Sequence, residues 1–169
     1  MEQRYSIAIV GCGPAGLSAA LNARIRKKSL ILFGENGVSN KVSRPASIKN
    51  YLGMPSVSGE ELKEAFLQHI LEMGITITNA HIDGIYPMGG YFVLSSGSKM
   101  YEAKAVILAT GAKASNLIPG EQQLLGNGVS YCATCDGLVY EGRTVAVVAY
   151  DEREEEDVRY LGKIARKVV

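Results

Sequence analysis

The pattern of apolar and polar positions at the start of the chain predicts a strand, a glycine-rich turn, a helix and a second strand. Two short apolar runs, Ser6–Val10 and Ser29–Phe33, flank a segment of good helix formers over Leu17–Arg26. Continuous apolar runs of this length are typical of parallel strands that are buried on both faces. The chain therefore opens with a unit of the α/β class.

The middle of the chain changes its period twice. A loop without a clear period, Val38–Gly53, precedes a helix that we expect from a capping box at Ser58 to Met73, with Gly74 as its stop. Long loops inside compact domains are usually functional, so this loop is a candidate binding segment. The following pattern predicts a small antiparallel insert and then a buried parallel strand: Ile75–Thr78, His81–Ile85, Tyr91–Ser95 and Met100–Ala103 for the insert, and Ala105–Thr110 for the buried strand.

A stretch with little periodicity, Lys113–Gly126, separates this part of the chain from the rest. We place a domain boundary near Ala114, which divides the chain into residues 1–114 and 115–169. The second part predicts a strand at Thr144–Ala149, a helix at Glu152–Arg166 and the beginning of another strand at Val168–Val169. The expected fold is an α/β chain of two domains, the second of them incomplete.

Composition narrows the class of protein. The chain has 169 residues, of which 47% are apolar, and a net charge of +1, which suits one substantial core and the start of a second. It contains no apolar run of membrane-spanning length, no signal-peptide pattern in its first residues, and no basic tract that suggests nucleic acid or anionic lipid as a partner. We therefore expect a cytoplasmic globular protein, in which a cysteine pair is more often catalytic than structural.

The turn after the first strand matches the pattern Gly-x-Gly-x-x-Gly at Gly11, Gly13 and Gly16. Between a strand and a helix, the first glycine makes the turn, the second lets the backbone approach a pyrophosphate at the helix N-terminus, and the third lets helix and strand pack closely. Glu35 follows the second strand, where a carboxylate can accept hydrogen bonds from an adenosine ribose. The alternative for Glu35 is a solvated turn residue, one step out of register because Gly34 occupies the strand end.

Cys132 and Cys135 form a Cys-x-x-Cys pair that Asp136 follows directly. Two thiols at this spacing can close a small disulfide, one of them is a good nucleophile near neutral pH, and the carboxyl group of Asp136 can supply or hold the proton. The alternatives are half of a zinc site and two inert, buried cysteines. A zinc site needs four ligands, and the third cysteine and both histidines stand far from the pair in sequence. We therefore expect a redox pair and no metal.

Four motifs in order resemble those of the thioredoxin reductase-like flavoproteins, over Ile7–Val169. Gly11–Gly16 is similar to the family's FAD pyrophosphate loop, Asn50–Gly53 to its flavin-side loop, Ala109–Ala112 to its second flavin contact, and Cys132–Gly137 to its redox centre. The resemblance implies a flavoprotein with two dinucleotide-binding domains. The first is a three-layer ββα Rossmann-like FAD domain, and the second, here incomplete, is a Rossmann-like domain that carries the redox disulfide.

The resemblance also implies roles for individual residues and a homodimer. Cys132 attacks the disulfide of a thioredoxin, Cys135 faces the flavin and exchanges electrons with it, and Asp136 protonates a leaving thiolate. In the loop after Val38 the chain has Ser39-Asn40-Lys41 instead of the family's usual Gly-Gly-Gln. By resemblance, FAD is held by Gly11, Gly13, Pro14, Ala15, Gly16, Glu35, Lys41, Asn50, Ile82, Thr110, Gly111 and Ala112.

The second dinucleotide unit departs from the NADPH-dependent members of that family. Where they have a Gly-x-Gly-x-x-Ala turn, this chain has Asp151–Asp157, with six acids and one arginine. Side chains block close backbone approach, and carboxylates at a helix N-terminus take the place of a phosphate and repel it by roughly 1 kcal/mol per pair even in water. In this the chain is similar to the ferredoxin-dependent flavin thioredoxin reductases, so we expect reduced ferredoxin as the electron donor.

Two other functions stay open. The first is the same chemistry with NADPH at an unusual site, for which Lys163, Arg166 and Lys167 supply the nearby positive charge. The second is a flavin-containing redox sensor without turnover. The family's return to the FAD domain, which carries a Gly-Asp pair, has no counterpart in this sequence, so we expect either a fragment or the first part of a longer protein.

Overall fold

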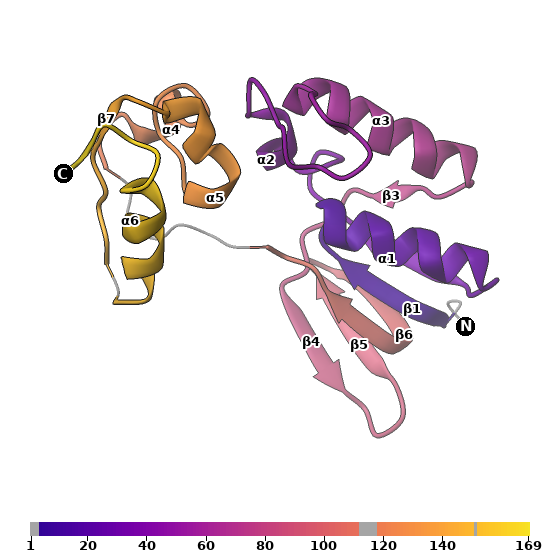
Figure 1. Ribbon diagram of the computed structural model, residues 1–169. Coiled ribbons are helices and arrows are strands. Elements are labelled where there is room, and N and C mark those ends of the chain that lie inside the picture. The colour runs from indigo at the N-terminus through magenta and orange to yellow at the C-terminus, as the bar shows by residue number, and fades with distance from the viewer. Residues whose placement is uncertain (1–3, 112–117, 151) are drawn as a thin grey trace. The chain divides into compact units, whose positions relative to one another are not determined.

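The computed structural model of the chain describes residues 4–111, 118–150 and 152–169 (Figure 1). The chain divides into two compact units. The first consists of Met1–Arg44 and Gly59–Ser115, and the second of Pro45–Ser58 and Asn116–Val169. Ala114 lies outside the described residues, so a domain boundary at that position stays a prediction.

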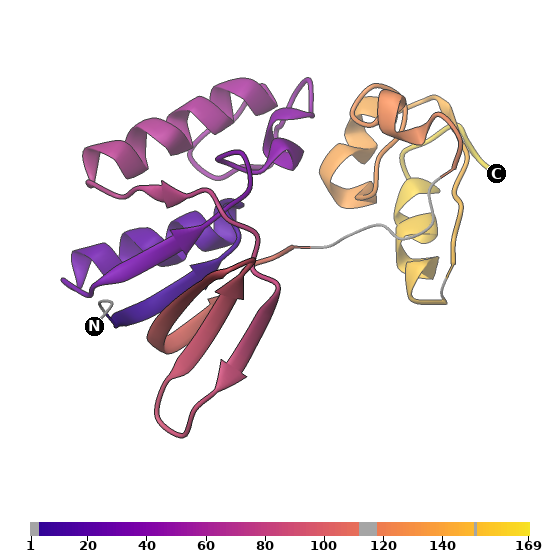
Figure 2. The ribbon, with the colours of Figure 1, turned by 180° about the vertical axis from the view of Figure 1, so that it is seen from behind.

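A six-stranded mixed sheet with the strand order β3-β2-β1-β6-β5-β4 forms the framework of the first unit. Its strands are β1 (Tyr5–Val10), β2 (Leu30–Phe33), β3 (Ile77–Thr78), β4 (Gly84–Pro87), β5 (Phe92–Ser96) and β6 (Lys99–Leu108). Its helices are α1 (Pro14–Ile25), α2 (Asn40–Ser43) and α3 (Gly59–Glu72). Helix α1 contacts β1 and β2 and runs alongside β1, as Figures 1 and 2 show from opposite sides.

The predicted strand–turn–helix–strand unit is confirmed. Pro14 begins α1, where its fixed φ angle suits a first helical turn, and Gly74, with a φ of +64°, follows the end of α3. Strand β1 pairs in parallel with β2 on one side and with β6 on the other. The carboxyl ends of these three strands therefore meet at one edge of the sheet, where open α/β sheets bind their ligands.

The antiparallel insert is smaller than the sequence predicts. Strand β3 pairs in parallel with β2, through Leu32 with Ile77 and Phe33 with Thr78, so it belongs to the parallel part of the sheet. Only β4, β5 and the first half of β6 are antiparallel to their neighbours. The direction of a strand depends on its partner, and the partner of β3 lies far away in sequence.

Strand β6 is one continuous strand where the sequence predicts two. Its first half pairs antiparallel with β5 and its second half pairs parallel with β1, and Ala103 takes part in both pairings. The expected burial of the second half is wrong for Ile107 and Leu108, which are 38% and 67% exposed. Helix α1 packs mainly over β1 and β2 and contacts β6 less extensively, so the end of β6 is only partly covered.

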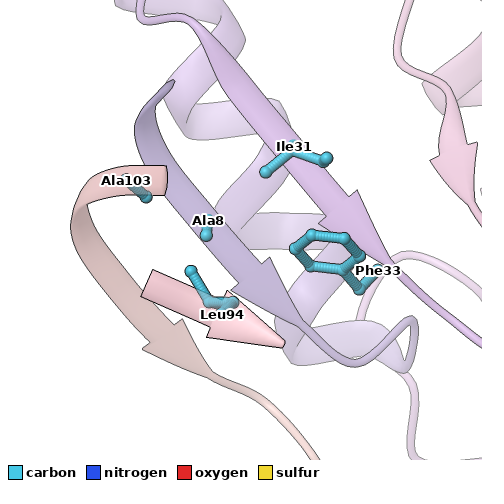
Figure 3. Close-up of a cluster of buried hydrophobic side chains, with 5 residues drawn as sticks. All are labelled: Ala8, Ile31, Phe33, Leu94 and Ala103. Carbon is cyan, nitrogen blue, oxygen red and sulfur yellow. The ribbon is translucent and has the colours of Figure 1, made fainter. Parts of the chain in front are cut away.

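A cluster of buried side chains ties the parallel and antiparallel parts of the sheet together (Figure 3). Phe33 packs edge-on against Tyr101, with 4.9 Å between the ring centroids. Burial of an aliphatic or aromatic side chain of this size contributes about 1.5–3 kcal/mol. The cluster joins β1, β2, β5 and β6, and it consists of Ala8, Ile31, Phe33, Leu94 and Ala103.

The second unit contains short elements. They are α4 (Glu121–Leu124), α5 (Ala133–Asp136), the 3-10 helix η1 (Gly137–Tyr140), β7 (Thr144–Val145), the 3-10 helix η2 (Glu152–Glu154), α6 (Glu155–Leu161) and β8 (Lys167–Val168). Strands β7 and β8 are parallel. At the junction of α5 and η1, a Cβ atom on Gly137 would lie 3.0 Å from both Tyr160 and Ile164, so this glycine allows the redox segment to pack on α6 and the residues after it.

The predicted elements at the C-terminal end of the chain exist, but two of them are shorter than expected. The expected strand Thr144–Ala149 contains β7 only, and the expected helix Glu152–Arg166 ends as α6 at Leu161. A two-residue ladder between two strands gives little stabilisation to residues beyond it. Across the described residues, every helix is too short or too polar to cross a membrane.

Candidate functional site

The glycine turn at the end of β1 has the geometry that a bound pyrophosphate requires. Gly11 has a φ of +115°, and a Cβ atom there would lie 2.1 Å from the carbonyl oxygen of Ala109. A Cβ atom on Gly16 would lie 1.9 Å from the carbonyl oxygen of Gly11. A Cβ atom on Gly13 would meet no protein atom within 4 Å. The first and third glycines are thus required by the fold, whereas the space beside the second is open for a ligand.

The N-terminus of α1 is free to bind an anion through its backbone. Gly13 is the N-cap residue, it has no side chain to accept a hydrogen bond from the first turn, and that turn contains no acidic residue. Unsatisfied N–H groups and the helix dipole favour a phosphate at such a position. The cradle therefore fits the pyrophosphate of a dinucleotide, and the residues around it are Gly11, Gly13, Pro14, Ala15 and Gly16.

Glu35 is exposed at the end of β2, and its carboxylate pairs with Nδ1 of His81. A second contact lies beside this pair, because the backbone N–H of Asn36 donates to the side-chain oxygen of Asn79 at 3.2 Å. Together they tie the turn after β2 to the segment after β3, which continues to the half-buried Ile82. The sequence suggests Glu35 but not its partner, because only the parallel pairing of β3 with β2 brings these residues together.

The remaining positions suggested for FAD lie in three places. Thr110 and Gly111 follow β6, and the backbone N–H of Thr110 would lie 3.2 Å from a Cβ atom on Gly11, so the second turn adjoins the first. Lys41 is an exposed residue of the one-turn helix α2 in the first unit. Asn50 belongs to the second unit, where it lines an open concavity with its neighbours Lys49, Tyr51, Leu52, Gly53 and Pro55. Ala112 lies outside the described residues.

Cys12, inside the glycine turn, is a buried free thiol. Its Sγ atom donates to the carbonyl oxygen of Phe33 at 3.3 Å, and burial raises the pKa of the thiol to about 11. Near neutral pH this cysteine is therefore protonated and chemically inert. Its side chain also fills space next to Gly34, where a Cβ atom would lie 2.3 Å from the sulfur.

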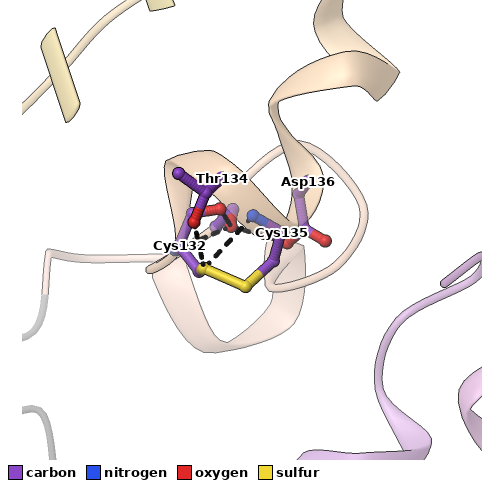
Figure 4. Close-up of a disulfide and its surroundings, with 5 residues drawn as sticks. Cys132, Thr134, Cys135 and Asp136 are labelled. Carbon is purple, nitrogen blue, oxygen red and sulfur yellow. Dashed lines mark hydrogen bonds between the residues drawn. A yellow bond between two sulfur atoms is a disulfide. The ribbon is translucent and has the colours of Figure 1, made fainter. Parts of the chain in front are cut away.

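The second unit carries a disulfide between Cys132 and Cys135, with 5.2 Å between their Cα atoms (Figure 4). Cys132 is the N-cap of α5, and its Sγ atom accepts the backbone N–H of Cys135 at 3.2 Å. The hydroxyl of Thr134 lies 3.5 Å from the same sulfur. Two hydrogen-bond donors beside Cys132 can stabilise a thiolate there once the disulfide is reduced. The redox pair that the sequence predicts is thus closed as a disulfide.

Asp136 is held by a hydrogen bond that the sequence pattern does not predict. The hydroxyl of Ser130 donates to Oδ2 of Asp136 at 2.6 Å and accepts the backbone N–H of Cys132 at 3.0 Å. The backbone N–H of Asp136 donates to the carbonyl oxygen of Cys132 at 3.2 Å. The acid and the first cysteine are therefore connected through one serine.

A buried carboxylate supports the segment that leads to Cys132. Glu121 is 6% exposed, and it accepts the backbone N–H of Ile118 at 2.6 Å and the phenol hydroxyl of Tyr131. A buried carboxylate with two donors fixes its surroundings, because loss of either bond leaves charge uncompensated. The sequence offers only a weak signal for this role, namely a glutamate directly after Pro119 and Gly120.

The acidic stretch lies at the beginning of α6, as the sequence predicts. Glu154 accepts the backbone N–H of Tyr150 at 2.9 Å, so a carboxylate of the chain itself occupies a donor at this turn. Glu155 forms an exposed ion pair with Arg159 at 3.3 Å. A carboxylate that binds the turn's own backbone leaves less room for a phosphate at the same position.

The first unit has a glycine turn that fits a dinucleotide at the carboxyl edge of its sheet, and the second unit has a Cys-x-x-Cys disulfide. This combination is typical of the flavin-dependent disulfide oxidoreductases, which is the class that the fold and the site define. The family model described as "Pyridine nucleotide-disulphide oxidoreductase" matches residues 5–149, and the chain belongs to this family. Within it the chain is thioredoxin reductase-like. Members of the family are FAD-binding flavoproteins, so FAD is the cofactor that the cradle fits.

Named relatives agree with this assignment. A thioredoxin reductase of Bacillus subtilis (strain 168) is 34% identical over 168 residues, which cover 99% of this chain and 53% of the relative. Among solved structures, a thioredoxin reductase from Streptococcus pyogenes MGAS5005 matches with a TM-score of 0.90 at 32% identity, covering 99% of this chain and 55% of that one. These matches confirm the α/β, Rossmann-like fold class that the sequence predicts.

A further solved structure is more similar in sequence. A ferredoxin-flavin thioredoxin reductase from Clostridium acetobutylicum is 52% identical with a TM-score of 0.66, covering 98% of this chain and 58% of that one. Identity and TM-score thus rank these two structures in opposite orders. The chain spans about half the length of the curated relatives it matches.

Proposed function

We propose that this chain acts in a flavoprotein that reduces thioredoxin through FAD and the Cys132/Cys135 pair, with ferredoxin as the electron donor. The observation that carries the proposal is the disulfide itself, at the start of a short helix and with Asp136 connected to Cys132 through Ser130. A structural disulfide needs no acid at its side, whereas a disulfide that opens and closes needs a group that moves protons.

The FAD site of the proposal lies at the carboxyl edge of the first unit's sheet. The open space beside Gly13 and the uncapped start of α1 receive the pyrophosphate, and Glu35 accepts hydrogen bonds from the ribose. The proposed set also includes backbone groups of Thr110 and Gly111, the segment at Ile82 and the side chain of Lys41. The roles of Asn50, which belongs to the second unit, and of Ala112, which lies outside the described residues, rest on the resemblance alone. When bound and reduced by the electron donor, FAD would supply the two electrons that open the disulfide.

The reduced pair then carries those electrons to the protein substrate. The Cys132 thiolate attacks one sulfur of the thioredoxin disulfide, the substrate S–S bond breaks, and a mixed disulfide forms. The Cys135 thiolate next attacks Cys132, which restores the Cys132–Cys135 bond and releases the reduced substrate. Asp136 gives a proton to a leaving thiolate and takes one from Cys135 between the two steps.

Ferredoxin is favoured over NADPH as donor by the acidic turn before α6 and by the relative of 52% identity, which is named a ferredoxin-flavin thioredoxin reductase. The positive charges that an NADPH site would use are not all free. The guanidinium of Arg166 donates to the hydroxyl of Thr144 at 3.3 Å, next to Lys167 in β8. A homodimer and a cytoplasmic location stay predictions from the sequence.

An anaerobic titration of the purified flavoprotein distinguishes the donors. The absorbance of oxidised flavin should fall when reduced ferredoxin is added and should stay constant with NADPH at the same electron equivalents. Rapid bleaching of the flavin by NADPH would refute the ferredoxin assignment. A Cys132→Ser variant should retain flavin reduction and lose thioredoxin reduction, whereas absence of thioredoxin turnover with every donor would favour the redox-sensor function.

A further inference from the structure

We infer that Ser130 is a positioning residue for the thiol–disulfide exchange, because its hydroxyl holds Asp136 beside Cys132 in both protonation states of the acid. This inference rests on the proposed function of the Cys132/Cys135 pair. Three groups surround the Ser130 hydroxyl oxygen within hydrogen-bond distance: Oδ2 of Asp136 at 2.6 Å, the backbone N–H of Cys132 at 3.0 Å and the carbonyl oxygen of Cys132 at 3.3 Å.

A hydroxyl has one proton to donate and two lone pairs that accept. With the disulfide closed and Asp136 ionised, Ser130 donates its proton to the carboxylate and accepts the N–H of Cys132. When Asp136 takes up a proton, its own O–H can donate to the second lone pair of Ser130, and the serine proton can turn to the carbonyl oxygen of Cys132. The two acceptors of the serine proton thus give the acid a partner before and after each proton transfer.

The exchange reaction requires a hydrogen-bond partner for Asp136 in both protonation states, because Asp136 changes its protonation state repeatedly in one turnover. A reduced chain begins with a Cys132 thiolate, a Cys135 thiol and a protonated Asp136. The first leaving thiolate takes the proton of Asp136, Cys135 passes its proton to Asp136, and the second leaving thiolate takes that proton. The chain loses two electrons and two protons, the substrate becomes a dithiol, and Asp136 ends ionised beside the closed disulfide.

Backbone contacts alone do not fix the carboxyl group. The N–H of Asp136 donates to the carbonyl oxygen of Cys132, which places the main chain but leaves the side chain free to rotate. Within the described part of the chain, the Ser130 hydroxyl is the group that hydrogen-bonds to the carboxylate of Asp136. Removal of the hydroxyl should therefore affect the acid first, and the fold of α5 much less.

The test uses the 169-residue chain, reduced in advance and freed of reductant, and mixes it anaerobically with hydroxyethyl disulfide. Acid quenching, alkylation and mass spectrometry follow the formation of the Cys132–Cys135 bond. This assay needs neither flavin nor ferredoxin nor thioredoxin. Failure of the inference is therefore separate from failure of the proposed function, which the donor titration and thioredoxin turnover decide.

We expect Ser130→Ala to slow disulfide formation about tenfold and Asp136→Asn about a hundredfold, within the range that general acid–base groups contribute. Ser130→Thr keeps the hydroxyl and should stay within about twofold of the unchanged chain, whereas Ser130→Val, which has the shape of threonine without the hydroxyl, should behave like Ser130→Ala. Ser98→Ala, in an exposed turn of the first unit, is the control for serine removal.

A double-mutant cycle separates positioning from a general structural effect. In the Asp136→Asn background, Ser130→Ala should cause no further loss, because the group through which Ser130 acts is already gone. An equal loss in both backgrounds would overturn the inference, and so would an unchanged rate in Ser130→Ala. If both hydroxyl-free variants lose the fold while Ser130→Thr keeps it, the hydroxyl is structural and the inference is likewise wrong.

Discussion

The pair of substitutions Gly13→Ala and Gly16→Ala should separate ligand binding from folding in the glycine turn. Gly13 has a φ of −84° and a ψ of −179°, which alanine adopts without strain, and its Cβ atom would meet no protein atom within 4 Å. Replacement of glycine by alanine at a compatible position stabilises by about 0.4–1 kcal/mol, and the poorer N-cap offsets a similar amount. The free energy of unfolding of the apoprotein should change by less than about 0.5 kcal/mol.

The FAD affinity of Gly13→Ala, unlike its stability, should fall. A methyl group at position 13 stands where the pyrophosphate approaches the backbone, so a charge-assisted hydrogen bond worth about 1.5–3 kcal/mol is lost. That corresponds to an increase in Kd of about 10- to 150-fold. By contrast, the Cβ atom of Gly16→Ala would lie 1.9 Å from the carbonyl oxygen of Gly11, so that variant should lose about 1–3 kcal/mol of stability or more.

Urea unfolding of the apoprotein and a fluorescence titration with FAD measure the two effects separately. The expected result is a Gly13→Ala variant with normal stability and weak FAD binding, beside a Gly16→Ala variant with low stability. An FAD affinity of Gly13→Ala equal to that of the unchanged protein would show that the pyrophosphate does not approach this glycine. A large loss of stability in Gly13→Ala would show that the space beside it is not open.

Three further outcomes are expected. Burial raises the pKa of Cys12 from 9.0 to about 11. The stability that its protonated thiol contributes should therefore be complete below pH 9.0 and should be lost as the pH rises through about 11. In urea unfolding, with Cys12→Ala as the control, the free energy of unfolding should fall by roughly 2–3 kcal/mol over this range. Exchange of His81 for alanine should change the free energy of unfolding by less than about 1 kcal/mol, because its pair with Glu35 is exposed. The FAD affinity of this variant should fall several-fold. An unchanged FAD affinity would count against Glu35 as the ribose ligand. A Tyr131→Phe variant leaves buried Glu121 with one donor fewer and should lower the urea midpoint by the equivalent of about 1–3 kcal/mol, whereas no change would argue against that bond.

Local signals in the sequence predict local structure well. Gly11, Gly13 and Gly16 mark the turn between β1 and α1 because their spacing has a steric cause, and the structure confirms that cause at Gly11 and Gly16. Gly74 ends α3 for a similar reason. The Cys132–Cys135 disulfide also follows from sequence spacing alone, because three positions suffice to bring the sulfurs together.

Features that depend on distant partners are not visible in the sequence. The direction of β3 depends on its pairing with β2, and the continuity of β6 depends on its two different neighbours. The sequence pattern therefore predicts an antiparallel insert that is larger than the one in the structure. The contact of Glu35 with His81 results from the same pairing. Ser130 is a local residue, yet its role depends on a side-chain rotamer, which composition and periodicity do not specify.

Cys12 and Gly34 lie so close together that the space between them holds only one small side chain. The sulfur of Cys12 lies where any Cβ atom at position 34 would have to be, so that position admits only glycine as long as the thiol is present. A carboxylate at the end of β2 must then stand one residue later, which is where Glu35 is found. The position of the proposed ribose ligand therefore depends on the size of a side chain in a different loop. We expect positions 12 and 34 to vary together in evolution.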